Sequence, residues 1–154
     1  MLFRSQKFID YYMDVAGRTS QLSHAVRLQV GAVIVKDNRI LSYGYNGMPS
    51  GWDNKCEDET YEEDGFHIKL TTKPEVLHAE TNAIAKVSGS TESSENATMF
   101  CTHAPCLQCA KLIYQSGIKN LYYRDTYRDS DGLEFLNKSG VNVHKHTNVT
   151  QDIN

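Results

Sequence analysis

Four residues of this chain combine side-chain types and spacings that suit metal-assisted chemistry. His78 and Glu80 lie two residues apart in "HAE", and Cys106 and Cys109 form a Cys-x-x-Cys pair directly after Pro105. Imidazole and thiolate are ligands that zinc accepts in tetrahedral sites. One histidine and two cysteines would leave the fourth position to water, which is the arrangement of a catalytic zinc site.

Glu80 is the candidate for proton transfer at this predicted site. Zinc lowers the pKa of a bound water from about 16 to about 7. Glu80 would take that proton and pass it to a substrate, help that is commonly worth about 10² to 10⁴ in rate. A lone Cys-x-x-Cys would also suit a redox pair or half of a structural zinc site, and a lone His-x-Glu indicates little. Taken together, the motifs match the signature of zinc deaminases that act on nucleobases.

The elements that would position these residues alternate along the chain. Apolar residues at helical or strand spacing, bounded by turn residues, indicate each of them. We expect helices over about residues 5–16, 77–87, 105–116 and 131–139. We expect a hairpin from strands 30–35 and 39–43, and further strands over 98–102, 118–123 and 141–146. This order predicts an α/β fold, a three-layer αβα sandwich with a five-stranded mixed sheet, whose motif helices begin at one edge.

Two segments are predicted to lie outside this framework, in one domain that spans residues 1–154. Residues 47–74 include the acidic stretch "CEDETYEEDG", which has no apolar period, so we expect a long loop that is either solvated or functional. Residues from about 145 to 154 are expected to be a frayed tail, with His144 to His146 at the solvated end of a strand.

Composition narrows the function classes. The 154 residues carry a formal net charge of −3, which disfavours a nucleic-acid partner. No apolar run reaches the length of a membrane span, and the first residues do not resemble a signal peptide. We therefore expect a cytoplasmic protein, in the host cytoplasm if viral, with no membrane partner. Its four cysteines are then expected to bind metal or to be buried.

From about residue 30 to residue 140, the chain resembles the cytidine deaminase superfamily, and more closely the allosteric deoxycytidylate (dCMP) deaminases of phages and bacteria. The resemblance rests on "VGAVIV", "GYNGMPSG", "HAETNAI", "PCLQCAKLIYQSGIKNLYY" and "DTYRDSDG". It implies hydrolytic deamination of dCMP to dUMP and ammonia, which supplies thymidylate synthesis. His78, Cys106 and Cys109 would hold one catalytic Zn²⁺ per subunit, and Glu80 would protonate N3 and the departing amine.

The resemblance also assigns residues to the substrate. In "TYR", Tyr127 would lie against the base and Arg128 would bind the phosphate. An aromatic ring stacks on a pyrimidine, and a guanidinium pairs with phosphate through two hydrogen bonds. Arg27 and Arg124 are the other candidates for the phosphate. The alternative is a loop of ordinary surface residues.

Three further contacts with the nucleotide follow from the resemblance. The backbone N–H of Ala79 or a carbonyl near Ala104 would fix the edge of the base. The amide of Asn46, which both donates and accepts hydrogen bonds, would read the sugar or the base.

The stretch Gly44-Tyr45-Asn46-Gly47 has two interpretations. Asn-Gly after a strand is a turn signal. In similar allosteric enzymes this region also helps to form an effector site between subunits, where dCTP activates and dTTP inhibits. Its glycines would let backbone N–H groups approach a triphosphate that carries Mg²⁺. A shared effector site implies a homo-oligomer, and the family habit points to a hexamer.

Several alternatives remain open from the sequence. One alternative is an enzyme that deaminates dCTP as a second or main substrate. Another is a member of the same superfamily that acts on a nucleoside or a tRNA base. A non-catalytic nucleotide sensor or DNA-uptake accessory would keep the zinc fold but would have little reason to keep Glu80. Some relatives bind a second, structural zinc, for which this chain offers an incomplete set: His24, Cys56, His67 and His103.

Overall fold

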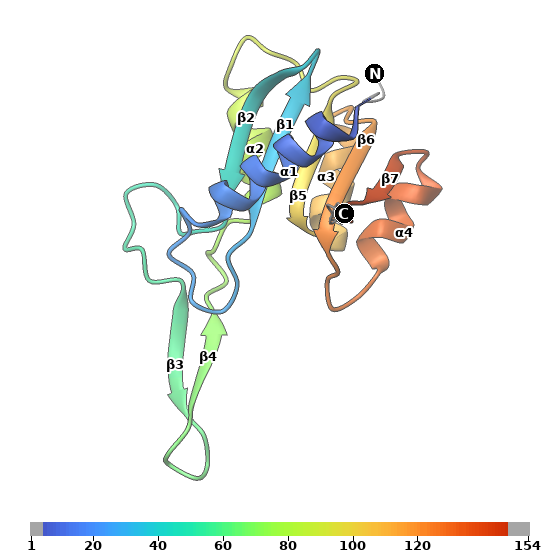
Figure 1. Cartoon of the computed structure of the whole chain (residues 1–154). Coiled ribbons are helices and arrows are strands. Elements are labelled where there is room, and N and C mark those ends of the chain that lie inside the picture. The colour runs from blue at the N-terminus through green and yellow to red at the C-terminus, as the bar shows by residue number, and fades with distance from the viewer. Residues whose placement is uncertain (1–4, 148–154) are drawn as a thin grey trace, which may run out of the picture.

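The computed structural model describes residues 5–147, in which helices pack around one mixed sheet (Figure 1). The helices in this range are α1 (Gln6–Ser20), α2 (Ala79–Ser88), α3 (Leu107–Gln115) and α4 (Asp131–Lys138). The strands of the sheet are β1 (Gly31–Lys36), β2 (Arg39–Tyr45), β5 (Thr98–His103), β6 (Asn120–Asp125) and β7 (Asn142–Lys145). Each of these elements was predicted from the sequence, with shifted ends.

The sheet has the strand order β2-β1-β5-β6-β7. β1 runs antiparallel to both β2 and β5, whereas β5, β6 and β7 are parallel to one another. The β1–β2 connection is the predicted turn, in which Asp37 and Asn38 both have positive φ. That backbone is typical of a tight turn that matches the twist of a hairpin.

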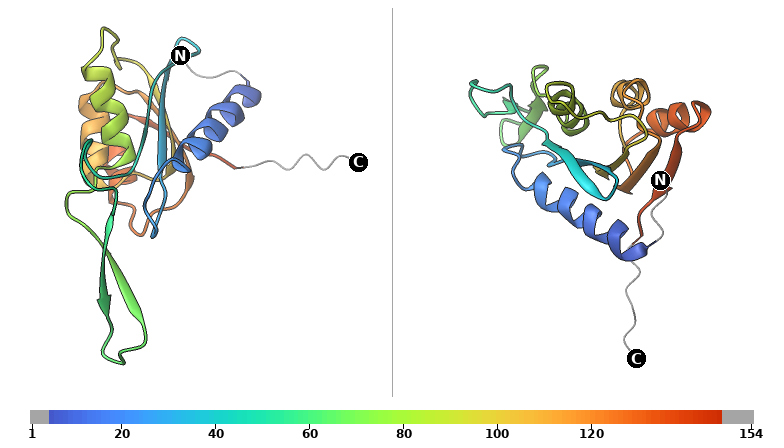
Figure 2. Two further views of the ribbon diagram at one scale, coloured as in Figure 1. Left: turned by 90° about the vertical axis from the view of Figure 1, so that its left-hand side faces the viewer. Right: turned by 90° about the horizontal axis from the view of Figure 1, so that it is seen from above.

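Helices cover both faces of the sheet, so the predicted three-layer α/β fold is confirmed. α1 lies on one face, and α2, α3 and α4 lie on the other (Figure 2). Alternate residues of a strand point to opposite faces. Phe100 of β5 therefore packs with Tyr12 and Met13 of α1, while its neighbours Met99 and Cys101 pack in the core beneath α2 and α3.

The prediction of a structureless segment over residues 47–74 was wrong in part. β3 (Glu57–Tyr61) and β4 (Ile68–Thr72) form an antiparallel hairpin, which we call the arm. The arm projects away from the sheet and its helices (Figure 1, Figure 2). Most of its side chains are exposed on both faces, so the paired backbone rather than a buried apolar face holds it together.

The prediction of a frayed tail from about residue 145 was also wrong at its first residues. His146 is buried rather than solvated, and its backbone N–H donates to the carbonyl of Tyr123 at 2.7 Å. Its Nε2 lies 2.7 Å from Oδ1 of Asp10 in α1. The rest of the predicted tail, residues 148–154, lies outside the described residues. No helix within residues 5–147 combines the length and the hydropathy needed to cross a membrane.

Candidate active site

Two helix starts bring the three candidate metal ligands together. His78 directly precedes α2, Cys106 directly precedes α3, and Cys109 lies in the first turn of α3. Nδ1 of His78 is 3.2 Å from Sγ of Cys109 and 3.6 Å from Sγ of Cys106. A tetrahedral zinc with ordinary bond lengths holds a nitrogen and a sulfur ligand about 3.6 Å apart. The donor set and its spacing therefore fit one zinc ion.

The electrostatics of this cluster favour thiolate at Cys106. Hydrogen bonds from Cys109 and His78 lower the Cys106 pKa to about 3. The hydrogen bond to Cys106, and then burial, raise the Cys109 pKa. The bond to Cys106 also raises the His78 pKa. Zinc takes cysteine as thiolate, so metal binding would release the proton of Cys109.

Glu80 lies next to this cluster, in the first turn of α2, and its side chain is buried. Burial raises its pKa from the ordinary value of 4.5, against the opposing effects of its own backbone N–H and of His78. Its carboxyl group interacts with the thiol of Cys109. A carboxyl with a raised pKa beside a metal site is suited to accept a proton and return it.

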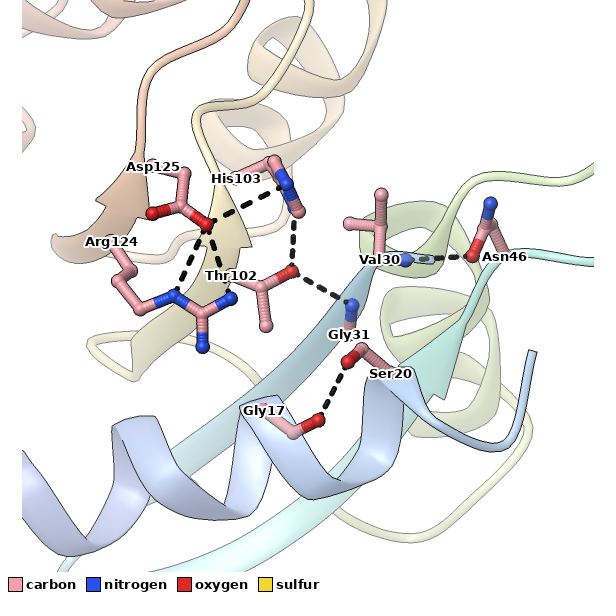
Figure 3. Close-up of polar contacts among 9 residues, drawn as sticks. All are labelled: Gly17, Ser20, Val30, Gly31, Asn46, Thr102, His103, Arg124 and Asp125. Atoms are coloured by element: carbon pink, nitrogen blue, oxygen red, sulfur yellow. Dashed lines mark hydrogen bonds and ion pairs between the residues drawn. The ribbon is translucent and has the colours of Figure 1, made fainter. Parts of the chain in front are cut away.

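A cavity of about 920 Å³ opens in front of the cluster. Its lining includes His78, Glu80 and Cys106, together with most of the candidate substrate residues: Arg27, Asn46, Ala79, Tyr127 and Arg128. Arg124 does not line it. The guanidinium of Arg124 instead donates to Oδ2 of Asp125 at 3.1 and 3.2 Å (Figure 3). The volume is in the range of sites that bind small molecules.

Residues 6–125 match the family model described as "Cytidine and deoxycytidylate deaminase zinc-binding region". The chain belongs to this family. It is 39% identical over 144 residues to the deoxycytidylate deaminase of Homo sapiens, covering 88% of this chain and 78% of that protein. It is 34% identical over 166 residues to that of Enterobacteria phage T4, covering 85% and 86%.

A solved structure supports the same membership. It is the dCMP deaminase from the cyanophage S-TIM5 in complex with dCMP and dUMP, which aligns with a TM-score of 0.84 and 43% identity over 94% of this chain and 100% of that chain. The resemblance predicted from the motifs and the cytidine deaminase-like fold are confirmed.

Asn46 forms structural hydrogen bonds at the edge of the cavity. Its Oδ1 accepts the N–H of Val30 at 2.9 Å (Figure 3), and its Nδ2 donates to the carbonyl of Leu28 at 2.8 Å. One N–H of the amide and the second lone pair of its oxygen are left to a nucleotide. The predicted role of reading the sugar or base stays a prediction.

The predicted effector stretch, residues 44–47, is tied into the fold. A Cβ on Gly44 would lie 2.2 Å from the carbonyl oxygen of Ala79, so this glycine allows β2 to pack closely on α2. The N–H of Asn46 donates to Val30 and the N–H of Gly47 donates to Leu77, at 3.3 and 3.1 Å. These two N–H groups are not free for a triphosphate, contrary to the mechanism expected from the sequence.

Tyr45, the remaining residue of this stretch, is half-buried. It lies opposite Gly31 in the sheet, and its carbonyl accepts the side-chain amide of Asn82 at 3.0 Å. The cation of Lys86 lies 5.9 Å from its ring centroid.

A polar group beside the cavity was not found by sequence reasoning. Oγ1 of Thr102 accepts the N–H of Gly31 at 3.1 Å and lies 2.9 Å from Nδ1 of His103 (Figure 3). Nε2 of His103 lies 3.7 Å from Oδ2 of Asp125. Burial lowers the His103 pKa, against the opposing charge of Asp125, and this favours a neutral imidazole. The sequence offered His103 only as a ligand of a second zinc.

The candidate second zinc site does not assemble in residues 5–147. Besides the His78 cluster, the one group in that range with metal-ligand spacing is exposed on the arm: Glu62, Asp64 and His67. Cys56 is buried at the root of the arm and belongs to neither group. Cys101 is a buried strand residue, as predicted.

Proposed function

We propose that this protein catalyses the hydrolytic deamination of dCMP, in which dCMP and water give dUMP and ammonia. One observation carries the proposal: a single cavity is lined by His78, Cys106 and Glu80 of the predicted metal site and also by a tyrosine ring and two guanidinium groups. The first set suits attack of water on an aminopyrimidine, and the second suits a base and one phosphate. Two relatives are named deoxycytidylate deaminases, and the S-TIM5 enzyme was solved with dCMP and dUMP.

His78, Cys106 and Cys109 would hold one zinc ion per chain. That ion supplies the Lewis acidity that makes a water acidic enough to deprotonate near neutral pH. Glu80 would accept a proton from the water that attacks C4 and deliver it to N3 of the cytosine ring. It would then carry the proton of the added hydroxyl group to the departing amine, so that the C4–N bond breaks and the C4 carbonyl forms. Its burial supports this role, because a carboxyl whose pKa is raised accepts a proton more readily than an exposed one.

The remaining contacts are assigned to the base and to the phosphate of the nucleotide. The N–H of Ala79, at the start of α2, has no partner within its helix and is available to the base edge, with the carbonyl of Ala104 as the alternative. Tyr127 would stack on the base, and Arg27 and Arg128 would bind the phosphate. Arg124 is left out of this assignment because it does not line the cavity.

Regulation and assembly are proposed on the resemblance to allosteric dCMP deaminases. In this proposal the chain forms one domain, residues 1–154, and assembles into a homohexamer. dCTP activates the hexamer and dTTP inhibits it, with Mg²⁺ bound to the triphosphate. The enzyme supplies dUMP for thymidylate synthesis in the cytoplasm. Within residues 44–47 the effector would contact the side chains of Tyr45 and Asn46, because the N–H groups of Asn46 and Gly47 are already bonded. The net charge of −3 supports the absence of a nucleic-acid partner.

Steady-state assays on dCMP, dCTP and deoxycytidine test the substrate assignment. We expect the highest kcat/KM for dCMP, because deoxycytidine lacks the phosphate and the two extra phosphates of dCTP have no cationic partner in this assignment. Dominant activity on deoxycytidine would contradict the phosphate contacts. Dominant activity on dCTP would replace dCMP by the triphosphate as the main substrate.

A further inference from the structure

The loop that carries Arg27 has little apolar anchorage. The side chains of Val26 and Leu28, which flank Arg27, are 73% and 43% exposed. Residues 26–28 also lie outside the helices and strands. The position of this loop must therefore depend on hydrogen bonds that its backbone makes with other segments.

Asn46 binds the carbonyl of Leu28, and the root of the arm binds the N–H groups of the two preceding residues. Glu57, the first residue of β3, is only 4% exposed. Its Oε1 accepts the backbone N–H groups of Val26 and Arg27, at 2.9 and 3.1 Å. Hydrogen bonds to an ionised acceptor are stronger than those between neutral groups. One buried carboxylate, 30 residues further along the chain, thus fixes the backbone of Arg27.

The other strand of the arm contacts the side chain of the same arginine. Nη1 of Arg27 donates to Oγ1 of Thr72 at 3.1 Å. Thr72 is the register partner of Glu57 across β3 and β4, and directly opposed residues point to the same face of a hairpin. Just beyond this pair, the N–H of Lys73 donates to the carbonyl of Cys56 at 2.8 Å and closes the root.

We propose that Glu57 and Thr72 are positioning residues that hold Arg27 for the substrate phosphate, so that the root of the arm is part of the nucleotide site. Both residues line the cavity together with Arg27. Glu57 fixes the backbone of Arg27, and Thr72 fixes the position of its guanidinium. This inference rests on the proposed function, because it requires that Arg27 contacts the phosphate.

Substitutions of Glu57, assayed on dCMP and on deoxycytidine, test the inference. We expect Glu57→Ala to raise the KM for dCMP about tenfold with little change in kcat, because a mobile loop no longer presents Arg27. Activity on deoxycytidine should be unchanged. Glu57→Gln should restore most of the affinity, because its carboxamide oxygen still accepts both N–H groups. Glu59→Ala, which removes an exposed carboxylate two residues along the same strand, should behave as wild type.

Thr72 provides a second test that does not remove a buried group. Thr72→Val should raise the KM for dCMP and Thr72→Ser should not. Arg27→Ala gives the full increase in KM that loss of the arginine causes. Adding Glu57→Ala to it in a double variant should raise the KM no further. Equal losses on dCMP and deoxycytidine in Glu57→Ala and Thr72→Val would overturn the inference. The inference would also be overturned if Arg27→Ala raises the KM for dCMP but Glu57→Ala and Thr72→Val leave it unchanged. An unchanged KM in Arg27→Ala overturns the phosphate contact and this inference, but leaves dCMP deamination standing.

Discussion

Arg128 is held beside its neighbour Tyr127 at the edge of the cavity. Its guanidinium carbon lies 5.4 Å from the centroid of the Tyr127 ring, and Nη2 lies 3.4 Å from the Tyr127 hydroxyl. We expect Arg128→Ala to raise the KM for dCMP about tenfold or more, because the variant loses a charged hydrogen-bonding partner of the phosphate. Arg128→Lys should restore only part of the affinity, since an ammonium lacks the planar fork.

Steady-state kinetics on dCMP measure this effect, and Arg39→Ala is the matched control. Arg39 pairs with Glu92 on the surface and does not line the cavity, so its loss should leave the KM unchanged. If Arg128→Ala binds dCMP as tightly as the wild type does, the phosphate contact assigned to Arg128 is wrong.

Asp10 and His146 give the protein a stability term that depends on pH. The hydrogen bond from His146, and then that from Gln6, lower the Asp10 pKa below the ordinary value of 3.8. The ionised carboxylate therefore stabilises the fold above 3.8, and this contribution is lost as pH falls through the lower pKa of the folded state. Asp10 is partly exposed, which limits the size of the effect.

Urea unfolding of wild type and Asp10→Asn at several pH values measures this term. The asparagine oxygen still accepts the hydrogen bond, so the comparison isolates the charge. We expect the wild type to be the more stable protein at neutral pH, with the difference shrinking as pH falls below 3.8. A difference that does not change with pH would contradict the assigned cause.

At the scale of residues, the sequence predicts those site residues whose arrangement depends on local spacing. Cys106 and Cys109 are separated by less than one helical turn, and the structure brings both sulfurs to His78. The tasks of Glu57 and Thr72 depend instead on hairpin register and on a loop 30 or more positions away. No local pattern in "CEDETYEEDG" distinguishes Glu57 from its exposed acidic neighbours, so only the fold identifies it.

At the scale of elements, close packing of β2 on α2 positions the helix that carries Glu80. A Cβ on Gly44 would lie 2.2 Å from the carbonyl oxygen of Ala79 and 2.6 Å from the backbone nitrogen of Ala83. Backbone atoms cannot yield as a flexible side chain can, so Gly44→Ala would push α2 away from the sheet. Because α2 carries Glu80 and follows His78, we expect this variant to lose both thermal stability and activity.

Gly89→Ala is the matched control, at the far end of the same helix. Its added Cβ would lie 3.7 Å from the carbonyl oxygen of Ala85, which is an ordinary van der Waals contact. Melting temperature and dCMP turnover should stay near those of the wild type. Equal behaviour of Gly44→Ala and Gly89→Ala would show that the β2–α2 contact does not position the site.

The elements that could be predicted are those that bury one or both faces. β1 is buried along five of its six residues, and its run "AVIV" stands out in the sequence. The arm strands "EDETY" and "IKLTT" are almost wholly exposed. The first shows no alternation of apolar and polar types, and the alternation in the second covers too few residues to indicate a strand. Backbone pairing holds this hairpin, and backbone pairing leaves little trace in side-chain pattern.

At the scale of the whole molecule, the sheet brings the predicted zinc ligands together from two separate helices. α2 and α3 both pack on the face opposite α1, and their first turns meet beside the cavity. Zinc would link these two helices in the folded state alone. A ligand at about 100 times its dissociation constant stabilises the folded state by about 2.7 kcal/mol.

Thermal unfolding of chelated and zinc-loaded protein measures this link. We expect removal of the metal to lower the melting temperature and added Zn²⁺ to restore it. Mg²⁺ is the control, because it prefers oxygen ligands and should not substitute at a site with two thiolates. Identical melting temperatures with and without zinc would contradict binding at this cluster.

The most direct test of the central claim is to measure zinc content and dCMP turnover on the same preparations of wild type and Glu80→Gln. The account predicts one zinc per chain in both proteins. It also predicts that turnover falls by about 10² to 10⁴ or more in the variant, because the proton carrier is lost while the ligands remain. A wild-type protein without stoichiometric zinc, or a Glu80→Gln protein that keeps its turnover, would contradict it.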